Sequence, residues 1–225
     1  MKTLLAIILI GLSTMGFAQH PIEKNVGDFN EIKVFDLIEV NLIQSNENKV
    51  IIKGKDTEDV EIINKNGLLK IRMKLDKIFN GDETFVAVYY THIDVIDGNE
   101  GAFIVSNELI KQDSITLKTQ EGATIKVGLD VENLDTKAVT GGIVETRGRA
   151  KKQTVVLNTG GIYKGKDLET KQTLVKVQAG GEASVNASYF VDASVKVGGD
   201  IYIYGNPKQI DQKTTLGGNI TQRSL

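Results

Sequence analysis

Hydrophobic and polar positions alternate in short runs along most of the first half of the chain. Runs this short and rich in β-branched residues are typical of strands, because successive side chains on a strand point to opposite faces. Asn66–Gly67 separates two such runs and predicts a tight hairpin, since both residues tolerate positive φ. The runs include EIKVF (31–35), LIEVNLIQ (37–44), VEIINK (60–65) and LLKIRMKL (68–75).

The second half is punctuated by small dipeptides at a near-constant spacing. Between the second residues of successive pairs, the spacings are 21, 20, 19, 20, 18 and 19 residues. A repeat of this length predicts a fold in which short units stack on one another, because one unit cannot bury its apolar face alone. The pairs are Glu100–Gly101, Glu121–Gly122, Gly141–Gly142, Gly160–Gly161, Gly180–Gly181, Gly198–Gly199 and Gly217–Gly218.

Each repeat has the same order of parts: a strand, a glycine corner, a second strand and a polar corner. TLVKVQA (173–179) and EASVNA (182–187) flank one glycine pair, and DLETK (167–171) forms a polar corner. Coils stacked about 4.8 Å apart would satisfy each other's backbone groups and align their apolar positions. The sequence therefore predicts an all-β protein: a β-solenoid (β-helix-like) of about 20-residue repeats over residues 99–225. The β-rich region 19–98 before it either joins the same stack or forms a separate sandwich.

The N-terminus has the features of a secretory signal peptide. Lys2 supplies a positive charge, residues 4–12 are an unbroken apolar run, and Gly16 and Ala18 provide a small-residue cleavage pattern. We expect residues 1–18 to be removed, which places the mature protein in the periplasm or at the cell surface, or outside the cell. The mature chain contains no apolar stretch long enough to predict a transmembrane segment.

Composition narrows the classes of function. The chain has no cysteine, so we expect neither a lipoprotein anchor nor a disulfide. The formal net charge is −2 and basic residues are mixed with acidic ones, which argues against nucleic acid as a partner. With 23 glycines and only 2 prolines, the composition indicates many tight turns between strands rather than disorder.

No motif points to catalysis, a metal or a cofactor. The glycine pairs precede strands, whereas phosphate-binding loops precede helices. The only histidines, His20 and His92, are far apart in sequence, and a zinc site needs three or four ligands. The acidic stretch from Asp94 to Glu100 matches no calcium loop and is interpreted as a turn. We expect no catalytic residue, no metal site and no cofactor.

Aromatic side chains are the weak binding candidates. Tyr202 and Tyr204 alternate on one predicted strand, and Tyr163 stands on another. Rows of tyrosine bind sugars or proteins, although they are also common on solvated sheets. Possible lyase or hydrolase residues are scattered through different repeats: Arg147, Arg149, Asp192, Lys196 and Asp200.

Beyond these patterns, the chain resembles a bacterial family described as auto-transporter adhesin, head GIN domain. The resemblance lies in residues 29–54 (FNEIKVFDLIEVNLIQSNENKVIIKG), in VEIINKNGLLKIRMK (60–74) and in the glycine-punctuated repeats that end with LGGNITQ (216–222). It implies an exported β-helical protein of Gram-negative bacteria with an adhesin-like role.

The predicted function is an exported, non-catalytic module that binds a protein or glycan through the faces of the stack. The alternatives are a carbohydrate-active enzyme (a polysaccharide lyase or hydrolase) and a structural envelope protein that self-associates. The oligomeric state is left open.

Overall fold

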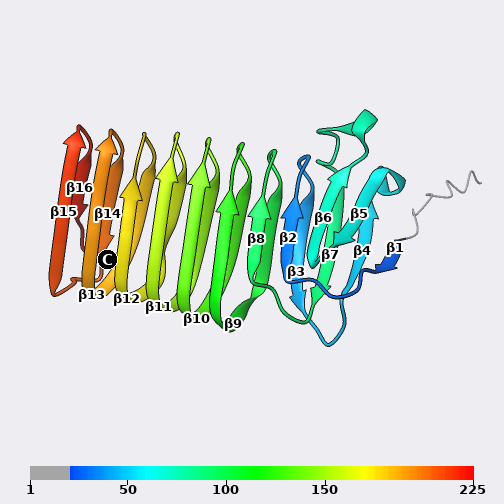
Figure 1. Cartoon of the computed structure of the whole chain (residues 1–225), viewed down its shortest axis with the longest axis horizontal. Helices are drawn as coiled ribbons and strands as arrows, with labels where there is room; N and C mark the ends of the chain where they lie inside the picture. The colour runs from blue at the N-terminus through cyan, green and yellow to red at the C-terminus, as the bar shows by residue number, and fades with distance from the viewer. Residues whose placement is uncertain (1–20) are drawn as a thin grey trace, which may run out of the picture.

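The computed structural model describes residues 21–225, in which the chain winds into a flat β-solenoid (Figure 1). The signal-peptide prediction for residues 1–18 lies outside the described residues. The strands form one 16-stranded sheet that turns back at every corner, which gives two facing layers. Among the described residues the only helical elements are two short 3-10 turns, η1 (Thr57–Asp59) and η2 (Leu75–Lys77). The prediction of an all-β solenoid is confirmed.

Layer 1 is built around the strands that run toward the glycine corners, and layer 2 around the strands that leave them. The short strands of layer 1 are β5 (Val60–Lys65), β6 (Leu68–Met73), β2 (Glu31–Val34), β8 (Val95–Gly98) and β15 (Gln209–Leu216). Those of layer 2 are β1 (Ile22–Asn25), β4 (Lys49–Gly54), β7 (Thr84–Tyr90), β3 (Glu39–Gln44), β14 (Asp200–Tyr204) and β16 (Asn219–Gln222).

Five long strands bend midway at the polar corners and so contribute to both layers. The first half of β9, for example, pairs with β3, while its second half pairs with β8. The polar corners lie along the lower edge of the stack and the glycine corners along the upper edge (Figure 1). These strands are β9 (Phe103–Thr119), β10 (Thr124–Val139), β11 (Ile143–Asn158), β12 (Ile162–Val177) and β13 (Glu182–Val197).

Successive coils pair in parallel and in register, so that one position in the repeat forms a column along the stack. Thr124 is opposite both Phe103 and Ile143 on its neighbouring coils. The glycine corners are joined in the same way, since the Gly101 N–H donates to the Glu121 carbonyl oxygen at 2.9 Å. Equivalent residues are therefore neighbours in space although they lie about 20 positions apart in sequence.

The turns at two corners are shifted by one residue from the glycine pairs seen in the sequence. Thr140 (φ 49°) and Gly141 (φ 72°) form the turn at one corner, and Thr159 and Gly160 form the next. Gly142 follows the first turn and is needed for a different reason: a Cβ there would lie 2.7 Å from the Thr119 carbonyl oxygen. Gly141 is thus required for its positive φ, and Gly142 for the close approach of the neighbouring coil.

Residues 21–98 lie in the same stack, in an order that differs from their order in sequence. The coil formed by β2 and β3 is inserted between the β6–β7 coil and the β8–β9 coil. Its corner has no glycine: Asp36 (φ 59°) and Leu37 (φ 64°) take the two positive-φ positions. Antiparallel β1, β4 and β5 close this end of the stack.

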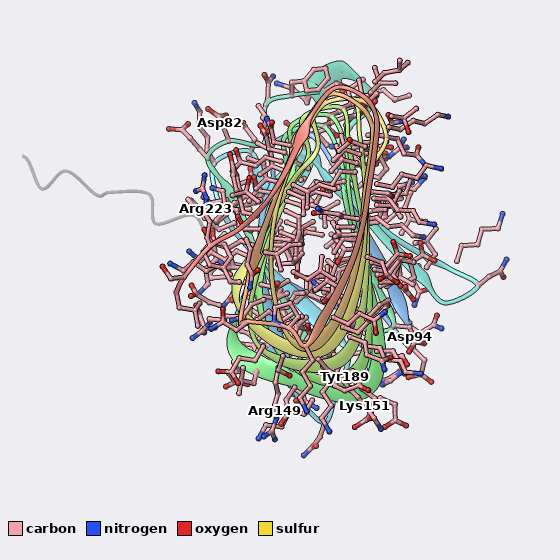
Figure 2. The ribbon with its side chains drawn as sticks, turned by 90° about the vertical axis from the view of Figure 1, so that its left-hand side faces the viewer. Asp82, Asp94, Arg149, Lys151, Tyr189 and Arg223 are labelled. Atoms are coloured by element: carbon pink, nitrogen blue, oxygen red, sulfur yellow. The ribbon has the colours of Figure 1, made fainter. Side chains whose placement is uncertain are left out.

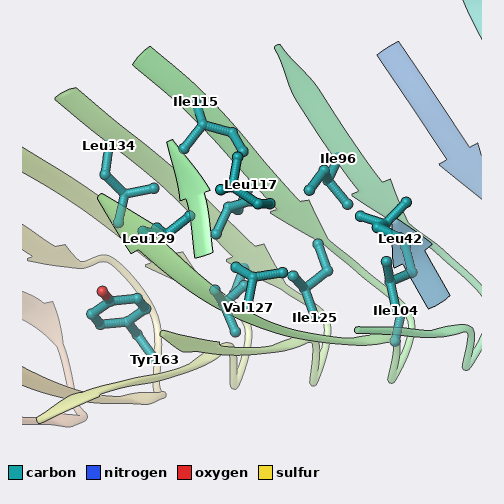
Figure 3. Close-up of a cluster of buried hydrophobic side chains, with 14 of the residues drawn as sticks. Leu42, Ile96, Ile104, Ile115, Leu117, Ile125, Val127, Leu129, Leu134 and Tyr163 are labelled. Atoms are coloured by element: carbon teal, nitrogen blue, oxygen red, sulfur yellow. The ribbon is translucent and has the colours of Figure 1, made fainter. Parts of the chain in front are cut away.

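The interior is a continuous apolar core, part of which is seen in Figure 3. The side chains become smaller toward the C-terminal end in one column of layer 1, whereas layer 2 still buries Ile201 and Ile203 near that end. That column of layer 1 consists of Leu69, Ile32, Ile96, Leu117, Thr136, Val155, Val175 and Ala193, all of them buried.

The terminal coil breaks the apolar pattern at its inward positions. Gln212 is in register with buried Ala193, and Thr214 with buried Val195. On β16, Gln222 is in register with buried Ile203. Polar residues at these positions allow the last coil to meet water, as capping repeats do in other stacked folds.

Candidate interaction surface

The structure overturns the expectation that Tyr163 is a surface residue. Tyr163 is in register with Val144 and Ala183, which are both buried, and its own exposed fraction is 1 %. Its hydroxyl lies 2.6 Å from Thr146 Oγ1 and accepts a hydrogen bond from the Gln153 amide. Burial raises the pKa of Tyr163 well above its ordinary value. Tyr163 is therefore a core residue, and its neighbour Ile162 points outward instead.

Tyr202 and Tyr204 lie together on β14, and cationic side chains cover their rings. The Arg223 guanidinium carbon is 3.7 Å from the centroid of the Tyr202 ring. Lys166 Nζ lies 5.0 Å from the centroid of Tyr204, which is only 8 % exposed. Each of these cation–π contacts occupies one face of its tyrosine ring, which leaves less aromatic surface for a sugar.

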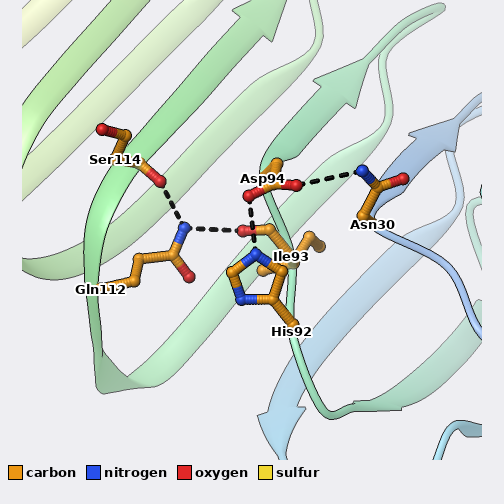
Figure 4. A network of polar contacts seen from close by, with 6 residues as sticks. All are labelled: Asn30, His92, Ile93, Asp94, Gln112 and Ser114. Atoms are coloured by element: carbon orange, nitrogen blue, oxygen red, sulfur yellow. Dashed lines mark hydrogen bonds and ion pairs between the residues drawn. The ribbon is translucent and has the colours of Figure 1, made fainter.

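The residues around His92 connect coils rather than forming a catalytic set (Figure 4). His92 Nε2 lies 2.7 Å from Asp94 Oδ1, and the Asn30 amide donates to Asp94 Oδ2 at 3.0 Å. The Gln112 amide donates to the Ile93 carbonyl oxygen at 2.8 Å. Together these contacts attach the β7–β8 linker to the coils on either side. Across residues 21–225, no group of three or more His, Cys, Asp or Glu side chains is arranged to hold a metal ion.

A carboxylate pair lies beneath the loop between β6 and β7. Burial raises the pKa of Glu100, and the nearby negative charge of Asp36 raises it further. The Asp36 carboxylate accepts hydrogen bonds from the backbone N–H groups of Met73 (3.0 Å) and Phe79 (3.2 Å). Because both of its oxygens accept hydrogen bonds, Asp36 holds the β6–β7 loop in place. The carboxylate pair therefore has a structural role.

The polar corners enclose a groove of about 430 Å³ along the lower edge of the stack, where Figure 2 shows Arg149 and Lys151 projecting. Arg149 makes a bidentate contact with Asp130, with distances of 2.6 and 2.8 Å. Lys151 Nζ lies 3.0 Å from Glu132. Since its opposite charges pair across neighbouring coils, the groove has little unpaired charge to offer a ligand.

The outer face of layer 2 has a row of apolar side chains, which we call the apolar strip. It consists of apolar residues from one register column and from part of the neighbouring column. Phe85, at 48 % exposed, is its most exposed member. Register places Phe85 and Phe103 on either side of Glu39. The strip comprises Phe85, Phe103, Ile143 and Ile162, with Ile51, Ala87 and Val105 beside them.

A shallow hollow of about 160 Å³ lies at the N-terminal end of the apolar strip. Phe85 and Phe103 form its walls, and Lys53 and Glu39 add charged groups to them. Asn41 also lines the hollow, and its Oδ1 atom is enclosed without a hydrogen-bond partner among the described residues. Enclosed polar atoms usually have partners, so this one makes the hollow unusual.

The sequence contains a signal for this strip in the run that forms β7. TFVAVYY (84–90) has apolar residues at both its odd-numbered and its even-numbered positions. Because successive residues of a strand point to opposite faces, this strand must have apolar side chains on both faces. One face fills the core and the other points to the outside of the stack.

The fold places the chain in the class of β-solenoid proteins. Within that class it belongs to the family described as "Putative auto-transporter adhesin, head GIN domain", whose model matches residues 28–207. This confirms the resemblance found in the sequence. A comparison with curated protein sequences gave no match.

Solved structures with similar folds come from Bacteroides and Parabacteroides species. A "putative adhesin" of Bacteroides fragilis NCTC 9343 has a TM-score of 0.83 at 18 % identity, covering 91 % of this chain and 96 % of that one. A "putative adhesin" of Parabacteroides distasonis ATCC 8503 has a TM-score of 0.74 at 20 % identity, with the same coverage of 91 % and 96 %. A "putative lipid binding protein" from the same P. distasonis strain has a TM-score of 0.67 at 17 % identity, again covering 91 % and 96 %. At these identities the likeness shows the fold.

Proposed function

We propose that this protein is an exported, non-catalytic interaction module of the adhesin type, which binds a protein or glycan partner against the apolar strip. The observation that carries the proposal is the outward column of Phe85, Phe103, Ile143 and Ile162 on a flat sheet. Glu39 and Thr124 interrupt the column, but the apolar side chains still gather on one outer face. Apolar side chains gathered on an outer surface mark interaction sites, because leaving them in water is unfavourable.

The chemistry of the strip suits a partner with both apolar and polar groups. The Phe85 and Phe103 rings provide flat apolar surfaces for a sugar face or an apolar side chain. Glu39 and Lys53 border the hollow and supply hydrogen-bonding groups beside the rings. Pairing between coils holds the backbone of these residues in place, so that little backbone freedom is lost on binding.

Export is supported by the apolar run and cleavage pattern of residues 1–18. No helix within residues 21–225 is long and apolar enough to cross a membrane. We place the mature protein in the periplasm or at the cell surface, where a binding module would meet envelope glycans or proteins of other cells.

The experiment is a binding assay of residues 19–225 against immobilised fibronectin, collagen, laminin and cell-wall glycans. We expect a saturable interaction with at least one of these, weakened about tenfold or more by the double substitution Phe85→Ser and Phe103→Ser. The control is Leu75→Ser with Phe79→Ser, because these side chains are also exposed, at 72 % and 55 %, but lie on the β6–β7 loop. No binding across the panel, or equal loss in both variants, would overturn the proposal.

A further inference from the structure

The outer face of layer 1 has a row of lysines at one position of the repeat, which we call the lysine row. Register puts Lys118 directly beside Lys137, and Val156 separates Lys137 from Lys176. Ser194 then separates Lys176 from Lys213. At about 4.8 Å between neighbouring strands, this row spans roughly 24 Å along the stack.

The four lysines of the row have no ion-pair partner within 4.0 Å among residues 21–225. Asp97 is in register beside Lys118, but its carboxylate is paired with Lys33 on its other side. The same column continues toward the N-terminal end to Lys33 and Lys70, but these two lysines already have interaction partners. Lys33 lies 3.3 Å from Asp97, and both ammonium groups lie within 6 Å of the Phe35 ring centroid, at 5.6 and 5.7 Å. The unpaired part of the row therefore begins at Lys118.

Like charges side by side on neighbouring strands destabilise a sheet. Lys118 and Lys137 have this arrangement, although many other columns of the protein pair opposite charges between coils, as Lys126 and Glu145 do at 2.7 Å. The lysine row thus costs the free protein stability, which an anionic partner lying along the row would restore.

The flanks of the row define the width of that partner. On the side toward the glycine corners, the residues two positions further along each strand are not acidic: Gln120, Val139, Asn158, Gln178, Lys196 and Thr215. On the other side lie three aspartates, Asp135, Asp192 and Asp211. A broad anionic surface such as a membrane would meet these aspartates, whereas a single narrow chain lying on the lysines and amides would not.

We infer that layer 1 binds a linear acidic polysaccharide, which runs along the lysine row perpendicular to the strands. A sugar chain with one carboxylate or sulfate on each repeat presents negative charges in a line, as the row presents positive ones, and the neighbouring amides donate hydrogen bonds to its hydroxyl groups. Single-stranded nucleic acid fits less well, because such sites interleave basic groups with a series of exposed aromatic rings. This surface is on the opposite layer from the apolar strip and does not depend on it.

The test measures binding of residues 19–225 to heparin and to polygalacturonate at low ionic strength, with neutral dextran and oligo(dT) as comparisons. The row variant is Lys118→Gln with Lys137→Gln and Lys176→Gln. The matched control is Lys111→Gln with Lys152→Gln and Lys171→Gln, which removes the same charge from exposed positions at the polar corners. Circular dichroism checks that both variants keep the β fold.

We expect both acidic polysaccharides to bind and dextran not to bind. The row variant should lose roughly tenfold in affinity and show a shallower salt dependence, since three exposed ionic contacts are removed. The control variant and Phe85→Ser with Phe103→Ser should bind like the unmodified chain, and this separates the inference from the proposed function. Equal loss in the control variant, no binding of either acidic polysaccharide, or tighter binding of oligo(dT) would each overturn the inference.

Discussion

The hydroxyl of Tyr163 lies 2.6 Å from Thr146 Oγ1 in the middle of the stack, so the largest fully buried side chain is held by hydrogen bonds inside an apolar interior. Gln153 donates to the same hydroxyl and accepts from Thr173 Oγ1 at 3.2 Å. This polar network lies among apolar neighbours, since Tyr163 is in register with buried Val144 on one side and buried Ala183 on the other. A glycine makes room for it, because a Cβ on Gly165 would overlap the Tyr163 ring.

The first prediction concerns the packing of the Tyr163 ring against Gly165. Gly165→Ala should lower the free energy of unfolding by about 1–3 kcal/mol, because the added methyl group forces the Tyr163 ring to move in a closely packed core. Denaturant unfolding followed by circular dichroism measures the change. Adding Tyr163→Leu should recover part of the loss, and the coupling is obtained from the double-mutant cycle with Tyr163→Leu alone. Strictly additive effects would show that the ring and the glycine are independent.

Neighbouring glycines at one corner should respond differently to the same substitution. Gly160 has φ +76° and open space around its Cβ position, so Gly160→Ala should cost only about 1–2 kcal/mol of backbone strain. Gly161 is not in the positive-φ region, but a Cβ there would overlap the Ala138 carbonyl oxygen of the adjacent coil. Gly161→Ala should therefore cost more, since backbone of two coils must separate. Equal losses of unfolding free energy would contradict this assignment of roles.

The third prediction is a pH dependence at the Asp36–Glu100 pair. Burial, together with the charge of Asp36, raises the pKa of Glu100 above its ordinary value of 4.5. The folded state consequently binds the proton more tightly than the unfolded state, and Glu100 lowers stability as the pH rises from about 4.5 through its folded-state pKa.

Glu100→Gln should therefore raise the midpoint of thermal unfolding at pH 7 and have little effect at pH values below 4.5. Glu169→Gln is the control, because Glu169 is exposed at a polar corner, at the other edge of the stack from Glu100. If Glu100→Gln changed the midpoint equally at both pH values, the charge of Glu100 would not be the cause.

Much of the fold follows from the spacing of the glycine pairs, because a constant interval leaves few ways to bury one apolar face per repeat. Two features of the fold could not be predicted from this spacing. Asp36–Leu37 is a corner without glycine, and its equivalence to Glu100–Gly101 becomes visible only through the Leu37 N–H, which donates to the Glu100 carbonyl oxygen at 3.0 Å. The insertion of that coil between two later ones is likewise a long-range pairing that no local pattern encodes.

The candidate site was harder to predict than the fold for a related reason. Ile162 and Tyr163 are both apolar, so alternation alone cannot decide which of them points inward. The direction is decided by register with buried Val144 and Ala183. The apolar strip and the lysine row are columns of residues about 20 positions apart, and they exist as surfaces only once the exact register is known.

The last prediction concerns the polar inward positions of the terminal coil. Gln212 and Thr214 are in register with Ala193 and Val195, and their polar groups let the open edges of β15 and β16 face water. Gln212→Val with Thr214→Val should extend the apolar core to this open end, and exposed strand edges beside apolar side chains favour pairing with another chain. We expect sedimentation velocity to show the unmodified protein as a monomer and the double variant as dimers or larger species. Lys213→Gln, between the two sites but pointing outward, should remain monomeric. If the unmodified chain already associates and Gln212→Val with Thr214→Val does not change it, the polar end is no cap and self-association becomes part of the native function.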